Sequence, residues 1–454
     1  MNEEDSLESL EGQNLELDSA IVENEEVRLH SMKLKEHSTK RELRRLRNTV
    51  SFRLGLLLTD VFRKPWTLLF LPFTIPFLLF SIGMERLGKW PLPYSEFDMN
   101  PSSEKLNRDC IVFFPTNGVG FGHFTRMYAL ARRFKKKSPD TEIVFFTTMP
   151  TLHLLYNEGF YTYHISGRSK TRGMAANEWN AMLEENLAMI FNQHRPKMFI
   201  FDGAFPYRGM LNAILGRSDM KMIWMRRGTF RKGSSIPVDS IQHFNMIIRP
   251  EDSVDLQSDE IAHNVEVIRC SPILLLDDEE LLPRVQARRR LGFPDDVKVV
   301  YVQLGAGRIN DIDSEVRLTV DAILEHDDVM VALGESMLGE RLEFNLERVR
   351  IIRDYPNSLY LNAFDASVQA GGYNSYHESR NSGVPTLFYP NMNTGMDDQL
   401  ARCKASEKEG WGIVIEHRNK DSINKGIEDL LTKEKLNLDI VSNNGAWEIC
   451  EKLS

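Results

Sequence analysis

From residue 109 onward, short apolar runs alternate with longer stretches in which apolar residues recur every three or four positions. The short runs predict buried strands, and the longer stretches predict helices that cover them. The first series of expected strands covers residues 110–115, 142–147, 198–202, 222–225 and 245–249, and the second covers 298–304, 329–333, 350–353, 366–370, 385–389 and 412–416. Strands that alternate with helices are typical of parallel sheets, so we expect an α/β protein with two doubly wound domains in tandem.

A charged connector at about residues 271–290 separates the two series. We therefore assign residues 105–275 to an N-terminal domain and residues 290–454 to a C-terminal domain. Open parallel sheets bind ligands at the carboxyl ends of their strands. Two such edges that face each other would form a cleft for two substrates.

The N-terminal ninety residues follow a different pattern, in three segments of contrasting character. Residues 1–30 carry many acids and a single arginine, which predicts a solvated acidic tail. Residues 31–64 are basic, and their apolar positions recur at helical spacing, which predicts a basic amphipathic helix suited to an anionic membrane surface. The alternative for this segment is a helix that packs on the protein's own body. Residues 65–90 begin with an uncharged apolar run that ends at Met84.

The apolar run from Pro65 to Met84 is long enough to span a bilayer. Its prolines argue against a straight helix, because Pro72 and Pro76 each remove a backbone donor that lipid cannot replace. We expect a broken, interfacial or re-entrant anchor, with peripheral or monotopic attachment through residues 43–84 and a single span as the alternative. The basic segment on the N-terminal side of the apolar run would keep that side of the membrane cytoplasmic. A single span would then put the rest of the chain outside the cell.

Composition and charge narrow the function classes. The chain of 454 residues is 42% hydrophobic and 27% charged, which fits a globular protein and excludes collagen-like and wholly disordered classes. Its four cysteines are far apart in the sequence, which argues against a disulfide framework or a structural zinc site. A net charge of −9 argues against general nucleic-acid binding.

A glycine-rich loop follows the first expected strand. It holds Gly118, Gly120 and Gly122 directly before His123. Such glycines leave backbone N–H groups bare at a helix start, where anions bind. The spacing lacks the glycine that a dinucleotide-binding fingerprint needs at position 123, which argues against NAD. In the first helical turn the dipole would keep His123 neutral and available as a base, although a helix-start residue with no chemistry is the alternative.

A second tight turn follows the strand expected at residues 298–304. Gly305, Gly307 and Arg308 in this turn suit a phosphate group. Asp311 and Asp313 resemble a metal-binding DxD pair, but a helix cap is the more common use of such acids.

The most informative motif begins at the strand expected at residues 366–370. Gly371 and Gly372 follow it, and Asn374 and Ser375 open the next helix, which together predict a cradle of N–H and hydroxyl donors for a diphosphate. The Glu378 carboxylate could accept both hydroxyls of a ribose. The structural alternative is that Ser375 and Glu378 form a capping box.

The segments GGYNSxxE, SGVPTLFYP and DDQLAR, in this order, resemble the donor-binding half of GT-B glycosyltransferases. The resemblance is greatest to the family of bacterial transferases that add N-acetylglucosamine to the peptidoglycan lipid intermediate. It is strong over about residues 359–415, weaker over 111–132 and absent before residue 100. It implies two Rossmann-like domains, preceded here by a membrane-associating helical extension.

The resemblance also implies roles for residues that match the motifs. Gly372, Asn374 and Ser375 would meet the diphosphate, and Glu378 would bind the ribose. Asp398 and Gln399 would hold hydroxyls of the transferred sugar, and His123 would be the base. The implied reaction is an inverting transfer of a hexose or N-acetylhexosamine from a UDP-sugar to a lipid-linked or polysaccharide acceptor, with neither a metal nor a cofactor.

Basic residues in the first half suggest an anionic acceptor. We expect Arg226 and Arg227 to bind it together with Arg126 and the loop of Gly118, Gly120 and Gly122. Asp202, which ends a strand, would pair with an arginine, orient the base or serve only the fold. Two other functions stay open: a nucleotide-sugar 2-epimerase of the same architecture, and an inactive membrane-bound binding protein. The expected partners are the sugar donor, the acceptor and a membrane surface, without nucleic acid.

Overall fold

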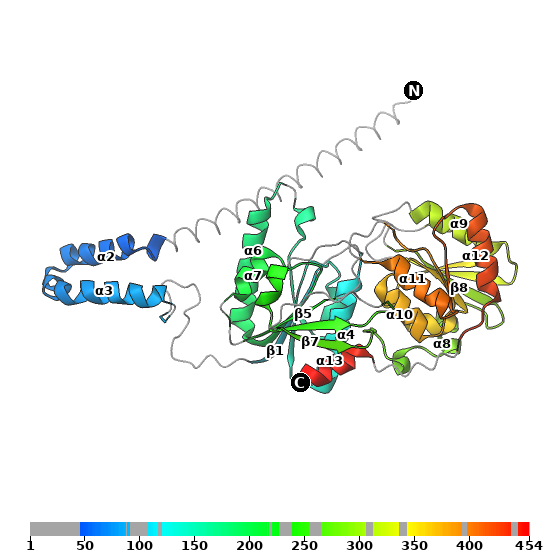
Figure 1. Ribbon diagram of the computed structural model, residues 1–454, viewed down its shortest axis with the longest axis horizontal. Helices are drawn as coiled ribbons and strands as arrows, with labels where there is room; N and C mark the ends of the chain where they lie inside the picture. Colours follow the sequence, from blue (N-terminus) through cyan, green and yellow to red (C-terminus); the bar gives the residue numbers. More distant parts are fainter. Residues whose placement is uncertain are drawn as a thin grey trace, which may run out of the picture. The chain divides into compact units, whose positions relative to one another are not determined.

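The computed structural model describes residues 46–87, 89–90, 108–116, 120–171, 173–215, 217, 220–226, 238–254, 265–305, 312–335, 343–392, 397–436 and 444–453 (Figure 1). The acidic tail expected at residues 1–30 and the basic segment up to residue 45 lie outside these ranges. The described residues form two compact units, one with the N-terminal helices and one with both sheets.

The first sheet is parallel and has seven strands in the order β3-β2-β1-β4-β5-β6-β7. Its strands are β1 (Arg108–Pro115), β2 (Glu142–Thr147), β3 (Tyr161–His164), β4 (Pro196–Asp202), β5 (Lys221–Met225), β6 (Met246–Pro250) and β7 (Glu266–Cys270). All five strands expected from the apolar runs are present. The edge strands β3 and β7 were not expected, because each is only partly buried and interleaves polar residues with apolar ones.

The second sheet is also parallel and has six strands in the order β10-β9-β8-β11-β12-β13. Its strands are β8 (Lys298–Gln303), β9 (Val329–Gly334), β10 (Val349–Ile352), β11 (Ala366–Gln369), β12 (Thr386–Phe388) and β13 (Gly412–Val414). Each of them matches an expected strand. The strand order reverses between β1 and β4 in the first sheet and between β8 and β11 in the second, and doubly wound sheets bind ligands beside such reversals.

Helices and short 3-10 helices of the unit that holds both sheets connect these strands. They are α4 (Gly122–Lys137), α5 (His153–Asn157), η3 (Val238–His243), η4 (Asp278–Glu280), α8 (Arg284–Leu291), α9 (Ile312–Leu324), η5 (Asn357–Ala363), α10 (Tyr373–Asn381), α11 (Gln399–Lys408) and α12 (Lys420–Thr432). Amphipathic α4 contributes much of the first core, in which Met127 and Phe134 pack with Ile111 and Ile200 of the sheet. The second core lies between β8, β9, β11 and the helices α9 and α12.

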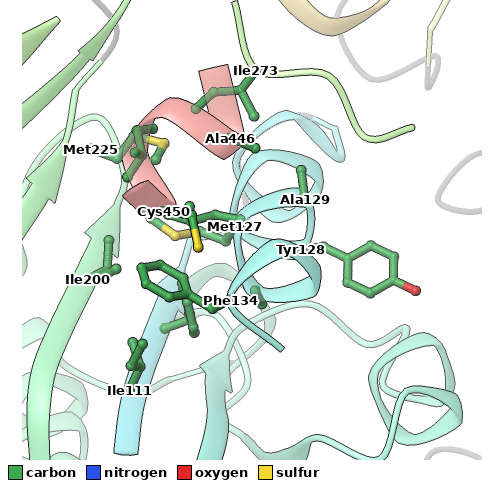
Figure 2. Close-up of a cluster of buried hydrophobic side chains, with 14 of the residues drawn as sticks. Ile111, Met127, Tyr128, Ala129, Phe134, Ile200, Met225, Ile273, Ala446 and Cys450 are labelled. Atoms are coloured by element: carbon green, nitrogen blue, oxygen red, sulfur yellow. The ribbon is translucent and has the colours of Figure 1, made fainter. Parts of the chain in front are cut away.

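The last helix, α13 (Gly445–Leu453), packs with the first core although it follows the second sheet in the sequence. Figure 2 shows Ala446 and Cys450 of α13 beside Met127 of α4 and Met225 of β5. Gly445 lies against the backbone at Ser271, so closely that a Cβ atom there would come within 1.9 Å of the Ser271 carbonyl oxygen. The first core therefore includes residues from the C-terminal end of the chain.

The other compact unit contains α6 (Ala176–His194), most of α7 (Arg208–Ile214), the turn η2 (Arg168–Lys170) and the N-terminal helices. Helices α6 and α7 meet at Asn180 and Gly209, where the Gly209 N–H donates to the Asn180 side chain over 2.8 Å. A side chain at position 209 would clash with the α6 backbone.

The N-terminal helices are α2 (Val50–Arg63), η1 (Pro65–Phe70) and α3 (Leu71–Arg86), and α2 lies beside α3 (Figure 1). The chain turns at Lys64 and η1, and α3 continues past both of its prolines, contrary to the expectation that they would break the helix. Pro72 lies in the first turn of α3, where the missing N–H is not needed, and Pro76 removes a single bond inside the helix. By length and composition, Pro65–Glu85 could cross a membrane, with a mean hydropathy of 2.0.

Candidate active site

A buried carboxylate at the end of β4 organises the first half of the site. The Asp202 Oδ1 atom accepts a 2.6 Å hydrogen bond from Nδ1 of His123, which lies in the first turn of α4. Arg126, one turn further along α4, donates from Nε and Nη2 to the two oxygens of Asp202, each over 2.9 Å. Asp202 thus pairs with an arginine and orients the histidine, two of the roles that the sequence left open for it.

The electrostatics of this cluster keep Asp202 ionised. Burial by itself raises the pKa of the carboxyl, but the charges of Arg126 and His123 hold the pKa of Asp202 below its ordinary value. An ionised Asp202 that accepts from Nδ1 selects the tautomer in which Nε2 of His123 can take up a proton. The His123 side chain is 19% exposed, whereas Asp202 and Arg126 are almost fully buried. Within the cluster, only the histidine is therefore placed to meet a substrate.

The structure places two expected acceptor residues differently from the sequence expectation. Arg126 is buried and its guanidinium is committed to Asp202, so it supports the histidine from behind. Arg226 follows β5, is buried, and stacks its guanidinium over the Trp224 ring at 5.2 Å. Gly120 and Gly122 lie at the start of α4, and a Cβ atom at Gly120 would meet nothing within 4 Å. Gly118 and Arg227 lie outside the described residues.

The turn after β11 has the form of an anion cradle. Gly371 has φ +75°, and a Cβ atom there would come within 2.3 Å of Cys403 Sγ, so both conformation and space require glycine. Gly372 is the N-cap of α10 and makes no side-chain cap, which leaves the first N–H groups of the helix available to an anion. The Asn374 Oδ1 atom is buried and has no hydrogen-bond partner among the described residues. An unsatisfied buried acceptor at a bare helix start indicates a ligand site.

The structure excludes the capping-box alternative for Ser375 and Glu378, because the N-cap is Gly372 and both residues lie inside α10. Burial raises the pKa of Glu378 to about 7. Among the described residues this carboxyl group forms no ion pair, so it can exchange hydrogen bonds with a ligand.

The expected sugar-binding pair also has structural bonds. The Asp398 Oδ1 atom accepts from the Ala401 N–H over 3.0 Å and caps α11. The Gln399 Oε1 atom accepts from the Asn391 N–H over 2.9 Å, so its NH₂ group is the part that could donate to a sugar. At the neighbouring turn, Gly305 has φ +104° and Gly307 and Arg308 lie outside the described residues.

A second buried cluster was not anticipated from the sequence. Arg402 of α11 donates from Nε and Nη2 to Asp252, just after β6, and Nη2 also donates to Asp397, with both Nη2 bonds 2.7 Å long. The His377 Nε2 atom of α10 lies 3.4 Å from Asp252 Oδ1. Arg402 Nη1 donates to the Gly371 carbonyl over 3.0 Å, so this cluster fixes the glycine turn to the first half of the chain.

Tyr373, the first residue of α10, lies between the two clusters. Its ring centroid is 5.6 Å from the guanidinium carbon of Arg126 and 5.7 Å from that of Arg402. Its hydroxyl donates to the Glu251 carbonyl over 2.9 Å. The helix that opens the anion cradle is thereby held against the helix that carries His123. The only sequence signal for this contact is the tyrosine inside the GGYNS motif.

Comparisons with curated proteins give two distant relatives, and no protein-family model matches the chain. The chain is 24% identical over 351 residues to a protein of Clostridioides difficile named UDP-N-acetylglucosamine--N-acetylmuramyl-(pentapeptide) pyrophosphoryl-undecaprenol N-acetylglucosamine transferase. That match covers 73% of this chain and 83% of the relative. A protein of the same name from Acetivibrio thermocellus is 24% identical over 329 residues, which cover 67% of this chain and 84% of the relative.

Solved structures resemble the chain over both sheets. A kitacinnamycin glycosyltransferase matches with a TM-score of 0.53 and 14% identity, over 76% of this chain and 97% of its own. The UDP-GlcNAc 2-epimerase of Methanocaldococcus jannaschii matches with a TM-score of 0.52 and 13% identity, over 76% of this chain and 99% of its own. MurG of Acinetobacter baumannii matches with a TM-score of 0.50 and 13% identity, over 76% of this chain and 98% of its own. These likenesses confirm the expected fold: the chain has two Rossmann-like domains in the GT-B arrangement.

Proposed function

We propose that this chain is an inverting, metal-independent glycosyltransferase. It moves a hexose or N-acetylhexosamine from a UDP-sugar to a lipid-linked or polysaccharide acceptor at the cytoplasmic face of a membrane. The observation that carries this proposal is the pairing of His123 with buried Asp202, in the same compact unit as the bare helix start after Gly372. The two named relatives transfer N-acetylglucosamine to a lipid-linked acceptor, which supports the same substrate classes here.

The proposed base is His123. It takes the proton of the acceptor hydroxyl on Nε2 while its Nδ1–H stays bonded to Asp202. The positive charge that forms on the imidazole is stabilised by the ionised carboxylate behind it. General-base help of this kind contributes about 10²–10⁴-fold to a rate. The acceptor oxygen then attacks the anomeric carbon from the side opposite the diphosphate, which inverts the configuration.

The departing diphosphate gains negative charge during the reaction. The N–H groups at the start of α10 and its helix dipole can stabilise that charge without reorganising. The turns at Gly305 and Gly371 bring further backbone to the same end of the second sheet. Such fixed dipoles are the basis for proposing a reaction that needs no metal or other cofactor.

Membrane attachment completes the proposal. A lipid-linked acceptor keeps its reacting sugar close to the bilayer, so an enzyme held at the surface meets it at high local concentration. The apolar helices α2 and α3 are the part of the chain suited to such attachment. We propose peripheral or monotopic attachment through residues 43–84.

The test is a transfer assay with the full chain, radiolabelled UDP-sugars and a membrane lipid extract, in buffer with and without EDTA. We expect label in the lipid or polysaccharide fraction only when extract is present, and equal rates with EDTA. No transfer from any UDP-hexose or UDP-N-acetylhexosamine would contradict the proposal. Conversion of UDP-N-acetylglucosamine to its 2-epimer without extract would instead support the epimerase alternative, and a loss of transfer in EDTA would contradict metal independence.

A further inference from the structure

The exposed apolar surface of the molecule is concentrated in α2, η1 and α3. More than half of the large hydrophobic side chains that are exposed among the described residues lie between residues 46 and 90. They include Phe62, Trp66, Leu69, Phe73 and Phe77, each at least 62% exposed. Soluble surfaces seldom expose a contiguous apolar patch of this kind without a binding partner.

A buried ion pair joins the two helices of this segment at one end. Arg53 donates from Nη1 to Glu85 Oε2 over 2.6 Å and from Nη2 to Oε1 over 3.1 Å. The two side chains are only 11% and 7% exposed, and Ser81 accepts a further bond from Arg53 over 3.4 Å. Arg53 lies in the first turn of α2 and Glu85 in the last turn of α3. The segment is therefore a hairpin whose entry and exit lie at the same end.

The arm formed by α2 is too short to cross a bilayer. From Arg53 to Lys64 the helix rises about 16 Å at about 1.5 Å per residue. The hydrocarbon core is about 30 Å thick. Because the chain reverses at Lys64 and comes back to Arg53 through Glu85, the length of Pro65–Glu85 does not carry it to the opposite face.

The sides of α2 differ in chemistry. Asp60 and Arg63 are three residues apart and share one side of the helix, while Leu58 and Phe62, four residues apart, share another. Helix α3 has no charged residue before Glu85, and its apolar residues lie on all sides. A hairpin that lies in the plane of the membrane–water interface suits both helices. It places the α2 charges among the lipid headgroups and the Phe62 side of α2 among the acyl chains.

The charge around the hairpin favours anionic lipid. Arg47, Arg63 and Lys64 are exposed on the described part. The sequence directly before it, residues 31–45, has six basic residues against two acidic ones. Each lysine or arginine near an anionic surface adds to membrane affinity.

We propose that the hairpin of residues 50–86 is a one-sided membrane anchor, which embeds in one leaflet of an anionic bilayer and returns the chain to the face that it entered from. This inference rests on the proposed function only for the identity of that membrane face, which the proposed function makes the cytoplasmic one. It replaces the single span with a topology that keeps both flanks of the anchor on the side of the nucleotide-sugar.

Cysteine labelling of the full chain in bacterial membranes tests this topology. All four native cysteines are buried, so single introduced cysteines can be followed with a membrane-impermeant maleimide. The exposed flanks are probed by Leu46→Cys and Leu87→Cys, the embedded surface by Phe73→Cys, and the matched control on the α/β body is Tyr156→Cys. Each variant is labelled in right-side-out spheroplasts and in inverted vesicles.

We expect positions 46, 87 and 156 to label in inverted vesicles and not in spheroplasts, and position 73 to label about tenfold or more slowly until detergent is added. Labelling of positions 46 and 87 from opposite sides would overturn the proposal in favour of a span. Labelling of position 73 as fast as position 156 would overturn it by showing a hairpin in water. Because labelling does not depend on sugar transfer, its outcome is independent of the transfer assay.

Flotation with the purified full chain gives a second measurement. Vesicles of phosphatidylglycerol and phosphatidylcholine should carry the wild-type protein upward in a density gradient. The double variant Phe73→Asp/Phe77→Asp should stay at the bottom, and Tyr156→Asp should float like the wild type. Equal flotation of the double variant would overturn the assignment of the embedded surface.

Discussion

Two buried clusters in this molecule share three residue types but differ in how far the histidine is exposed. Each contains an aspartate at or just after the end of a strand of the first sheet, an arginine that binds it through two nitrogens, and a histidine within 3.4 Å. In the first cluster Asp202 binds Arg126 and His123. In the second, Asp252 binds Arg402 and contacts His377. Residue types alone therefore do not distinguish the cluster of the proposed base from the other cluster.

The two clusters differ in the solvent exposure of the histidine side chain. His123 is 19% exposed at the start of a helix, whereas His377 is 3% exposed inside α10. Burial lowers the pKa of His377, so it stays neutral and packs between aromatic rings. Although burial opposes ionisation, Arg402 holds the pKa of Asp252 far below its usual range. The second cluster is thus a buried ion pair that joins the halves, and the first leaves the proposed base, His123, partly exposed.

The largest effect should come from breaking the structural cluster. Arg402→Met removes the guanidinium that satisfies Asp252 and Asp397 and leaves two buried carboxylates without their partner. Removing one partner of a buried pair costs about 3–5 kcal/mol. The free energy of unfolding, measured by urea denaturation, should fall by that amount. The control Arg380→Met removes a half-exposed pair with Glu409 and should cost less than about 1 kcal/mol. Equal effects of the two variants would contradict the structural role of Arg402.

A change in the cluster of His123 and Asp202 should lower the rate of sugar transfer and leave the free energy of unfolding nearly unchanged. His123→Ala should lower sugar transfer by about 10²-fold or more, because it removes the base while leaving the second half intact. Binding of UDP, measured by calorimetry, should stay within about twofold of the wild type. The exposed His153→Ala is the matched control and should transfer at the wild-type rate. Wild-type transfer by the His123 variant would reduce His123 to a helix-start residue.

The sequence predicted the fold through continuous apolar runs, which is why the central strands were found and the half-exposed β3 and β7 were missed. Asp202 and His123 were identified because Asp202 ends a strand and His123 begins a helix, and parallel sheets place such ends at one edge. Arg402 and Asp252 were missed because their contact joins residues 150 positions apart, and no local pattern encodes such a pairing. The hairpin partner of α2 was missed for the same reason, since Arg53 and Glu85 belong to different helices.

A third acid, Glu378, extends the comparison, because its pKa is set mainly by the loss of solvent around it. Glu378→Ala should weaken UDP binding by about 1–3 kcal/mol through the loss of an acceptor for ribose hydroxyls. The control Glu428→Ala removes an exposed acid of α12 and should leave the affinity unchanged. Calorimetry gives both values. Unchanged affinity in the Glu378 variant would rule out its contact with the ribose.

The smallest effect is a pH dependence that separates Glu378 from the two aspartates. Burial raises the pKa of Glu378 to about 7 from its ordinary value of 4.5, so it gains its charge near neutral pH, whereas Asp202 and Asp252 are charged well below that. In the ligand-free protein the protonated form of Glu378 contributes stability that is complete below about pH 4.5 and is lost as the pH rises through about 7.

The affinity for a UDP-sugar should instead increase as the pH rises, because the ionised Glu378 carboxylate accepts hydrogen bonds from the ribose hydroxyls. A UDP-sugar is a suitable probe, since each of its phosphates carries one ester and one anhydride bond and does not titrate between pH 6 and 8. With a pKa of about 7 in the free protein, the affinity at pH 6 should be about tenfold lower than at pH 8. Glu378→Gln has no titrating group at this position and should bind with the same affinity at both pH values. If the affinity of the wild type and of this variant depended on pH to the same extent, another group would be responsible for the pH dependence. Glu378 would then keep a constant charge over this range, as the two aspartates do.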